Sequence, residues 1–385
     1  MSIFLEKIDT SRGRVYSFDM SSADPARIFN PAVPYNDLPP LPPAQELETA
    51  RVLKAVIEAR SELAALNTAC RLIPNPEIIT STIPLREAQA SNEIENIVTT
   101  NDELFRAEWS VDLEPSPATK EALRYRDALR QGVEALTHRP VSEKVAVEIC
   151  STLQGGHAAL RSTPGTYIGD PRRDTRIYTP PEGLEVIQGH LSAWERFLYS
   201  DHGLDPLVLM AATHYQFEAI HPFYDGNGRT GRILNILLLL QEEVLSLPVL
   251  YLSGYIVDNK DQYYRLLNAV TARGEWEAWV IFMVQAVAAS AKSTSLLIDD
   301  LRHLQDSTTT RVRELGIAPA AELTELLFIQ PYIRISDVIE RGLAKRQTAS
   351  GWLTTLADAQ ILKMWKVGRS KVFLNTAALE ILTRR

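Results

Sequence analysis

The sequence predicts a mainly α-helical protein that ends in a winged helix-turn-helix unit. Through most of the first 300 residues, hydrophobic side chains recur at intervals of three and four, the period of one helix face. The last 65 residues instead combine three short helical segments with two extended runs. Net charge changes in the same region, because residues 331–385 carry +6 while the whole chain carries −8. A separate C-terminal domain is therefore expected.

Length and composition bound the class of protein. A chain of 385 residues is expected to form two or three folding units. Hydrophobic residues make up 45% and charged residues 23%, which argues against the disordered, collagenous and coiled-coil classes. The net charge of −8 speaks against a whole-molecule grip on nucleic acid or acidic lipid, and it leaves a local basic patch open.

Nothing in the sequence indicates a disulfide framework, a structural zinc site or a membrane segment. The two cysteines, Cys70 and Cys150, form no C-x-x-C pair. The N-terminus lacks the apolar region of a signal peptide, and the densest apolar stretch, 233–240, is far shorter than the ~20 residues that span a bilayer. We expect a soluble cytoplasmic protein with no membrane partner.

Residues 1–43 are expected to form an irregular, proline-rich arm. Six prolines lie between positions 31 and 43, and such a density favours polyproline II conformation. The segment can be a docking ligand for an aromatic groove or an arm packed on its own protein. We favour the packed arm.

The helical pattern begins at Ala44, and we assign 44–118 to an N-terminal helical region and 119–305 to a helical core. One region, 172–181, alternates β-branched and aromatic residues and ends in two prolines, which suits an exposed hairpin or flap. We expect helices over 44–66, 84–105, 120–136, 142–153, 184–199, 206–220, 229–244, 258–271 and 276–304.

The C-terminal domain, 306–385, is predicted to hold helices over 321–329, 335–341 and 346–356, then a hairpin around 367–369. This order is that of a winged helix-turn-helix. Its recognition helix would open with Ala344, Lys345, Arg346 and Gln347, and Arg369 and Lys371 would lie on the wing. Such cations can contact DNA phosphates, with Arg346 and Gln347 facing base edges. Winged helices also serve as protein-docking and dimerisation modules, so both partners stay open.

The most informative segment is HPFYDGNGRTGR, residues 221–232, which joins two predicted helices. Gly226 and Gly228 permit positive φ, so that successive N–H groups can form an anion-binding concavity. The following helix adds its positive N-terminal end. Arg229 and Arg232 share one face of that helix and can make bidentate contacts with phosphate oxygens.

Two further residues complete this constellation. Asp225 would be repelled by a bare phosphate, which makes sense if it holds a divalent cation between two phosphates. His221, neutral to a large extent at physiological pH, can accept a proton from an incoming hydroxyl. Each element alone has an ordinary structural explanation: a helix-end histidine, a turn, or a solvated arginine face. Their combination within twelve residues favours a nucleotide site.

This segment resembles the signature of the Fic family, with every position of its pattern met. The resemblance implies a Fic-type helical core that transfers AMP from ATP to a protein hydroxyl. His221 would be the general base, and Asp225 would bind Mg²⁺ at the α- and β-phosphates. The anion-binding concavity for the phosphates would be formed by Gly226, Asn227 and Gly228. Arg229 would lie at the β-phosphate and Arg232 at the γ-phosphate. A phosphorylating subgroup has Lys at the second glycine, so Gly228 argues against that activity.

Residues 91–96, SNEIEN, resemble the inhibitory pattern of the same family: Ser or Thr, three residues, Glu, then Gly or Asn. Ser91 and Glu95 lie four apart and share a helix face. In the resembling proteins this Glu pairs with the second arginine of the signature, here Arg232, and obstructs the γ-phosphate. Asn96 completes the pattern. The alternative is an ordinary amphipathic helix with solvated Glu93 and Glu95.

The resemblance also assigns two peripheral features. The 172–181 segment corresponds to a flap that positions the target by strand-like pairing, with Ile177 as its side-chain clamp. Asn259 and Tyr263 lie where resembling proteins contact the adenosine portion. The alternative for that pair is ordinary helix packing.

We therefore expect an adenylyltransferase that moves AMP from ATP, with Mg²⁺, to a Ser, Thr or Tyr hydroxyl of a target protein, which can include a copy of itself. Two alternatives remain: a hydrolase that removes AMP with the same residues, and a DNA-binding regulator that senses ATP. A homodimer is implied by the resemblance alone.

Overall fold

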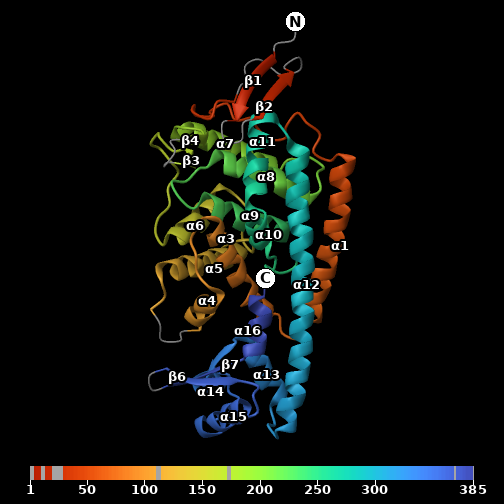
Figure 1. Cartoon of the computed structure of the whole chain (residues 1–385), viewed down its shortest axis with the longest axis vertical. Helices are drawn as coiled ribbons and strands as arrows, with labels where there is room; N and C mark the ends of the chain where they lie inside the picture. Colours follow the sequence, from red (N-terminus) through yellow and green to blue (C-terminus); the bar gives the residue numbers. More distant parts are fainter. Residues whose placement is uncertain are drawn as a thin grey trace.

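The computed structural model describes residues 4–9, 14–19, 29–109, 114–170, 175–367 and 370–384. The protein is mostly helical and elongated, with the C-terminal unit at one end and strands β1 and β2 at the other (Figure 1). The mainly α fold expected from the sequence is confirmed.

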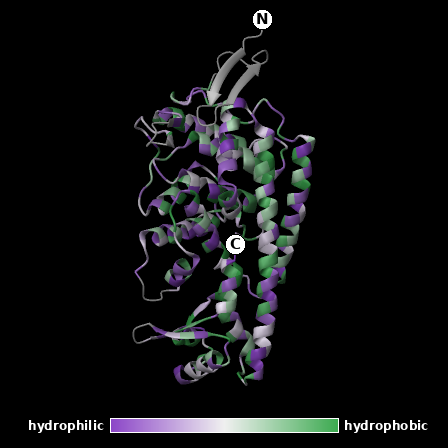
Figure 2. Cartoon of the chain, viewed as in Figure 1, coloured by the Kyte–Doolittle hydropathy of each residue, from purple (hydrophilic) through white to green (hydrophobic). Residues whose placement is uncertain are grey.

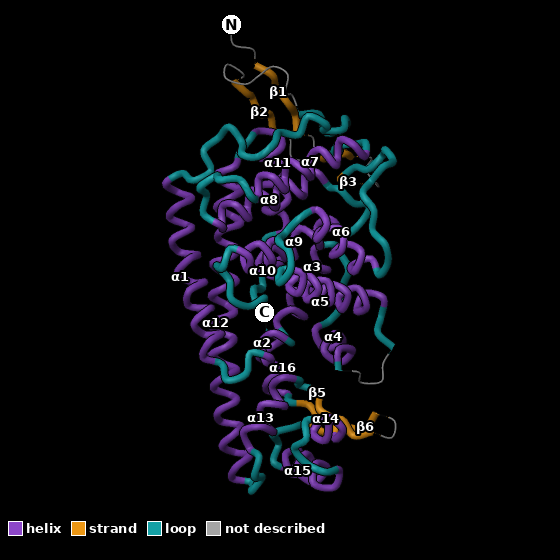
Figure 3. The backbone as a smooth tube through the Cα atoms, turned by 180° about the vertical axis from the view of Figure 1, so that it is seen from behind, coloured by secondary structure: helices purple, strands orange, loops and turns teal. Residues whose placement is uncertain are grey.

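Two long helices, α1 (Ala50–Leu72) and α12 (Trp276–Glu314), lie side by side along the long axis (Figures 1 and 3). They start together, because Thr49 Oγ1 donates to Glu277 Oε1 at 2.7 Å while Thr49 also caps α1. The buried positions of α1 recur at intervals of three and four and face α12. They are Val52, Val56, Ala59, Leu63, Leu66, Ala69 and Cys70.

Helix α12 extends ten residues beyond the predicted end at Leu304. By length and composition a window of it could cross a membrane, yet 61% of that window is buried inside the protein. Hydrophobic residues line much of α12 (Figure 2). Because α12 packs against α1 and α8 (Pro206–Ile220), it is a core helix that satisfies the same test.

The core that carries the site is built around α8 and α9 (Asn227–Gln241), which are buried on nearly all sides. Helix α8 starts where predicted, with Asp205 Oδ1 capping the N–H of Leu207 at 2.9 Å and Pro206 at the first position. The helices that pack around this pair are α5 (Pro117–Ala135), α6 (Glu143–Gln154), α7 (Leu184–Leu198) and α11 (Lys260–Arg273). Helix α10 (Leu252–Asp258) lies next to α11 and α12.

The predicted single helix over 84–105 is wrong: the structure divides it into α3 (Ile83–Ile94) and α4 (Asn101–Glu108), preceded by the short α2 (Glu77–Thr80). Helix α4 begins with a capping box in which Thr100 Oγ1 accepts from the N–H of Glu103 at 3.1 Å. The T-x-x-E spacing is a start signal that could have placed this boundary.

In the described part of the chain, strands occur in three small sheets. Strands β1 (Phe4–Asp9) and β2 (Arg14–Asp19) pair antiparallel, so the expectation of an irregular 1–43 segment is wrong there. The flap consists of β3 (Ile168–Asp170) and β4 (Thr175–Tyr178), also antiparallel. Residues 172–174 of the expected flap lie outside the described residues.

The proline-rich arm packs onto the base of the flap, as favoured from the sequence. The N–H of Tyr35 donates to Thr179 O at 3.0 Å, and Thr179 Oγ1 donates to Pro31 O at 2.7 Å. Phe29 stacks on Tyr178 with ring centroids 6.0 Å apart.

The C-terminal unit has the predicted order of three helices and a hairpin, with an additional strand β5 and an additional helix α16. Its sheet has the order β5-β7-β6, and all pairs are antiparallel. Arg369, expected on the wing, lies outside the described residues. The elements are α13 (Ala320–Ile329), β5 (Tyr332–Arg334), α14 (Ile335–Glu340), α15 (Arg346–Asp358), β6 (Lys363–Val367), β7 (Ser370–Leu374) and α16 (Thr376–Thr383).

Packing between α1 and α12 predicts a measurable difference between two leucines of α1. Leu66 is completely buried, whereas Leu53 is 41% exposed. Leu66→Ala should lower the free energy of unfolding by about 2–5 kcal/mol, because it removes apolar contacts and leaves a cavity. Leu53→Ala on the same helix should cost about 0.5 kcal/mol. Urea unfolding measures both, and equal losses would contradict the burial pattern.

Candidate active site

A cleft of about 580 Å³ lies between the flap, the C-terminal end of α3, α8 and α11. Flap residues Ile168 and Ile177, together with Tyr167 just before the flap, line one side. His221 and Arg232 line it from the motif segment. Four separate parts of the chain thus meet at one opening.

His221 forms the end of α8 in a left-handed conformation, with φ 49. Its N–H donates to Phe217 O at 3.0 Å, which closes the helix. Burial, together with the nearby positive charge of Arg161, lowers the pKa of His221 to about 4. The imidazole is therefore neutral at pH 7 and able to accept a proton.

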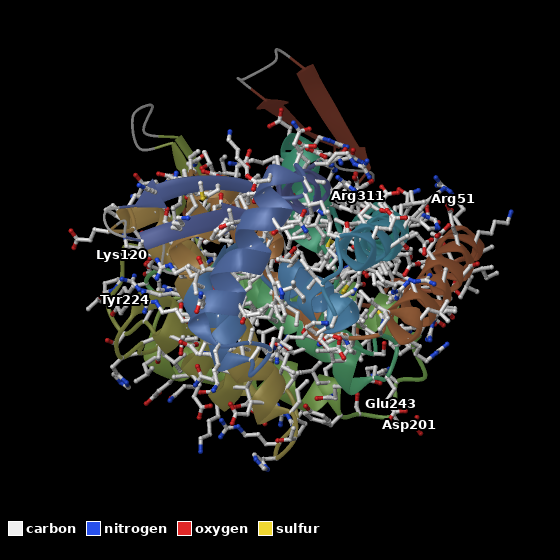
Figure 4. All side chains as sticks on the ribbon, turned by 90° about the horizontal axis from the view of Figure 1, so that it is seen from below. Arg51, Lys120, Asp201, Tyr224, Glu243 and Arg311 are labelled. Atoms are coloured by element: carbon white, nitrogen blue, oxygen red, sulfur yellow. The ribbon has the colours of Figure 1, made fainter. Side chains whose placement is uncertain are left out.

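The loop after His221 is held by the side chain of Asn227, a residue that the sequence predicted to bind the phosphates. The N–H of Phe223 donates to Asn227 Oδ1 at 2.8 Å, and Asn227 Nδ2 donates to Phe223 O at 2.7 Å. This pair of bonds closes the loop, so Asn227 shapes the site through its side chain. Tyr224, in the same loop, lies at the outer surface (Figure 4).

The two motif glycines have different roles, which corrects the prediction that both use positive φ. Gly226 has φ 84 and precedes α9, whereas Gly228 lies within α9 and is not among the described glycines with positive φ. A Cβ at Gly228 would collide with the Glu95 carboxylate and lie 2.9 Å from Arg232 Nη1. Gly228 therefore provides space, while the first N–H groups of α9 remain available to an anion.

Asp225 and Arg229 form a charged pair at the start of α9. Arg229 is buried, with Nη1 donating to Glu121 Oε2 at 2.8 Å and Nη2 to Asp225 Oδ2 at 3.2 Å. Asp225 is 75% exposed, and its Oδ1 accepts from the N–H of Gly226 at 2.7 Å. Neither residue lines the cleft itself.

The described residues contain no group of three or more His, Cys, Asp or Glu side chains that could hold a metal alone. Mg²⁺ usually binds through one or two carboxylates together with substrate phosphates. An exposed carboxylate beside the anion-binding end of α9 fits that arrangement. Asp225 is therefore suited to hold Mg²⁺ jointly with a nucleotide.

Arg232 is bound by the helix that the sequence predicted to oppose it. Its Nε donates to Ser91 Oγ at 2.8 Å, and its Nη2 donates to Ser91 O and to Glu95 Oε1, each at 2.9 Å. The Arg232 side chain is 1% exposed and that of Glu95 is 34% exposed. Burial alone would raise the pKa of Glu95, but the charge of Arg232 and its hydrogen bond lower it overall.

Asn96 ends α3 rather than contacting Arg232. It has φ 63, and its N–H donates to Glu93 O at 3.0 Å while that of Ile97 donates to Asn92 O at 2.9 Å. These bonds form a Schellman motif, which needs a left-handed residue and so favours Gly or Asn. The last position of the inhibitory pattern is thus explained by helix termination, which places Glu95 at the helix end.

Of the two residues expected at the adenosine portion, one lines the cleft and the other does not. Tyr263 lines the cleft, and its hydroxyl is 2.8 Å from His214 Nε2. Asn259 does not line the cleft, because its Nδ2 donates to Tyr255 O at 2.9 Å in the turn between α10 and α11. Lys260 and Asn268, which sequence reasoning missed, line the cleft instead.

Two other residues near His221 were missed. Glu218 lies three positions before His221 on α8 and lines the cleft, and burial raises the pKa of its carboxyl to about 7. The spacing of three on one helix was a signal that could have found it. Arg161 binds the carbonyl of His221 with Nε at 2.7 Å. It lies 60 residues away in the sequence, so no local pattern pointed to it.

Three family models match successive parts of the chain. They are described as "Fic/DOC family N-terminal" over residues 53–134, "Fic/DOC family" over 140–239, and "Protein adenylyltransferase SoFic-like, C-terminal domain" over 304–378. The chain belongs to the Fic/DOC family. The resemblance stated from the motif is confirmed.

Curated relatives share one part of this Fic/DOC protein. "Protein adenylyltransferase Fic" of Drosophila sechellia and that of Drosophila melanogaster are each 45% identical to it over 104 residues, which is 26% of this chain and 21% of each relative. The match therefore spans about a fifth of the length of these relatives. A solved Fic family protein from Desulfovibrio desulfuricans G20 has the same fold, with a TM-score of 0.55 and 20% identity over 86% of this chain and 97% of that one.

The low pKa of His221 predicts how stability depends on pH. The unfolded chain, with an ordinary histidine pKa near 6.5, binds more protons between about pH 6.5 and 4 than the folded protein does. Stability should therefore fall as the pH drops through this window. Asparagine tolerates the left-handed backbone at this position. Between pH 7 and pH 5, the free energy of unfolding of His221→Asn should therefore fall by about 1–2 kcal/mol less than that of the original protein.

Urea unfolding of both proteins at the two pH values measures this difference. His214, whose pKa is lowered to about 3 by burial, is present in both and cancels from the comparison. Identical pH dependences would show that the folded protein does not depress the pKa of His221.

Proposed function

We propose that this Fic/DOC protein is a protein adenylyltransferase that moves AMP from ATP to a Ser, Thr or Tyr hydroxyl of a target protein. The proposal rests on one observation: a neutral imidazole, a buried arginine and a strand-bearing flap line the same cleft. The family names of the relatives support the same chemistry. Most of this chain lies outside the part that matches the curated relatives, so the target protein stays open. A second copy of this chain is among the candidate targets.

In this reaction His221 accepts the proton of the target hydroxyl. The hydroxyl oxygen then forms a bond to the α-phosphorus, and the bond from that phosphorus to the bridging oxygen breaks to release pyrophosphate. The flap would align the target chain by main-chain pairing along β3 or β4, with Ile177, 48% exposed in the cleft, as the clamp. A hydroxyl fixed beside a neutral base needs little further reorganisation to react.

The first turn of α9 supplies the phosphate contacts. Its N–H groups and positive dipole end attract the triphosphate, and Arg232 would bind the γ-phosphate. Arg229 would turn toward the β-phosphate side from Glu121 and Asp225. Mg²⁺, held jointly by Asp225 and the phosphates, would neutralise part of their charge.

We infer that Glu95 restrains this activity. A guanidinium whose donors are bound to Ser91 and Glu95 offers less to the γ-phosphate, and the Glu95 carboxylate adds repulsion. A nucleotide that enters the cleft would then have its triphosphate held away from the reactive geometry. The same carboxylate could instead align water for removal of AMP, which remains the alternative direction of the reaction.

Replacing Glu95 tests the restraint. Glu95→Gly should raise transfer of AMP from labelled ATP by roughly 5- to 150-fold, the usual size of such coupling. Ser91→Ala should raise it less, because Glu95 remains. Glu95→Gly with His221→Ala should lose transfer while retaining ATP binding, measured by calorimetry. If Glu95→Gly transfers no more AMP to lysate proteins or to itself than the original chain, the restraint is wrong.

The C-terminal unit carries a second candidate function, binding of DNA. Lys345, Arg346 and Gln347 are exposed at the start of α15, and Lys363 and Lys366 are exposed on β6. A helix that begins with exposed cations beside a basic hairpin suits phosphate contacts. Protein docking and homodimer formation use the same kind of unit and stay proposals, as does a cytoplasmic location.

A gel-shift assay at physiological salt tests DNA binding. The chain should shift a duplex, and Arg346→Ala with Lys345→Ala should weaken binding and reduce its salt dependence by about two counterions. Arg51→Ala, an exposed arginine at the distant end of α1, is the matched control and should leave binding unchanged. If the original chain shifts no duplex at this salt, DNA binding is excluded and a protein partner is favoured.

A further inference from the structure

Arg161 lies between α6 and β3, and its side chain is buried with 1% of the residue exposed. Its guanidinium contacts backbone carbonyls rather than acids: Nε donates to His221 O at 2.7 Å, and Nη2 donates to Pro181 O at 2.9 Å and to Ile220 O at 3.3 Å. Its own N–H donates to Pro222 O at 2.9 Å. One residue therefore contacts the end of α8, the motif loop and the base of the flap.

A buried arginine normally has a carboxylate partner, because desolvating its charge is expensive. No ion pair of Arg161 occurs among the residues the structure describes. Part of the compensation comes from α8, because Ile220 and His221 supply carbonyls at the negative end of the helix dipole. The negative charge of Glu182 also favours the charged guanidinium, although Glu182 forms no described hydrogen bond to it. Burial lowers the pKa of Arg161, but an arginine remains charged in proteins.

The chain next to Arg161 strengthens the same connection. Leu160 and Phe223 form an antiparallel β-bridge, and the N–H groups of Ser162 and Thr163 donate to the Tyr224 hydroxyl at 3.0 and 3.2 Å. The segment before the flap thus runs along the motif loop. Pro181 follows the second strand of the flap. The guanidinium of Arg161 connects its carbonyl to the motif loop.

We propose that Arg161 is a positioning residue for the transfer reaction: its guanidinium fixes the base of the flap to the end of α8, and so holds His221 against the target strand. This inference rests on the proposed function of His221. Loss of the fork would let the flap and the imidazole move relative to each other, although neither would lose its own chemistry. A displacement of about 1 Å between reacting groups is sufficient for a large loss of rate.

Arg161 also acts on His221 through its charge. The groups that face the imidazole are Arg161, which disfavours the imidazolium, and Glu95 of α3 and Asp225 of the loop, which favour it. Glu218 contributes a backbone carbonyl one turn earlier on α8. Removing the guanidinium should therefore raise the pKa of His221, whereas a lysine should retain most of the effect.

Two variants separate geometry from charge. Arg161→Met removes both, while Arg161→Lys keeps the charge and loses the fork. In the Glu95→Gly background, kcat/KM for AMP transfer should fall about 100-fold with Met and about tenfold with Lys. The pKa of His221, followed by NMR of the imidazole, should rise by about half a unit with Met and stay nearly unchanged with Lys. The acid limb of the pH–rate profile should move with it.

Arg86→Met is the matched control, because Arg86 is also buried and also donates to a backbone carbonyl, that of Arg384 at 2.7 Å. It should leave the pKa of His221 unchanged. If Arg161→Met fails to fold, Arg161→Lys alone still tests the geometry. In that variant kcat should fall while the pKa of His221 stays nearly unchanged. An unchanged pKa with Met, or activity that only follows the folded fraction, would overturn the proposal. If transfer is absent from every variant while the pKa still rises with Met, the proposed function fails and the placement of Arg161 holds.

Discussion

The buried charge of Arg232 is the constraint on which the arrangement of the site depends. A guanidinium that is 1% exposed must have partners, because the free energy of desolvating an unpaired charge is larger than the stabilisation that most single interactions provide. Helix α3 supplies them through Ser91 and Glu95. The position of α3 against α9 is therefore not a matter of apolar packing alone. Any movement of α3 must give Arg232 another anion.

Helix α3 is in turn fixed by a second buried acid. Glu87, one turn before Ser91, accepts hydrogen bonds from the Tyr125 hydroxyl at 3.2 Å and from the N–H of Ser253 at 2.8 Å. The Ser253 hydroxyl also donates to Glu87. Burial raises the pKa of this carboxyl, while these three donors act in the opposite direction. Glu87, Ser91 and Glu95 follow one another at intervals of four, so a single stripe of α3 binds α5, α10 and α9.

The C-terminal unit contacts the same helix and its neighbours. Arg86 of α3 donates to Arg384 O and lies over the ring of Tyr251, 4.4 Å from its centroid. Ser81 Oγ, just before α3, donates to Ile329 O at 3.0 Å. Tyr332 in β5 donates its hydroxyl to Asp102 in α4. The helix that carries Glu95 is thus packed between the catalytic core and the C-terminal unit.

How much the sequence could predict depended on whether the cause was local. Helix α8 was placed correctly because Pro206 and the polar cap before it are local signals, and the motif pattern brought His221, Arg232 and Glu95 together. The break after Glu95 was missed, since a periodic pattern conceals a Schellman turn at Asn96. Arg161 and the second role of Gly228, which is space for Glu95, depend on segments far apart in sequence. Asn259 caps the end of α10 one turn of helix before the cleft residue Tyr263, so the sequence spacing alone could not show which of the two lines the cleft.

The charges at the site also explain how an acidic chain can hold a polyanion. In the state described here each motif arginine is already neutralised, Arg229 by Glu121 and Asp225 and Arg232 by Glu95. Of the three bonds to Arg232, the two from Ser91 come from a buried residue, while that from Glu95 comes from a side chain that is 34% exposed. A phosphate oxygen can therefore replace Glu95 without disturbing Ser91, exchanging one charge-assisted hydrogen bond for another. The exchange changes the net charge in the cleft but leaves Arg232 in place, so it requires only the Glu95 carboxylate to move.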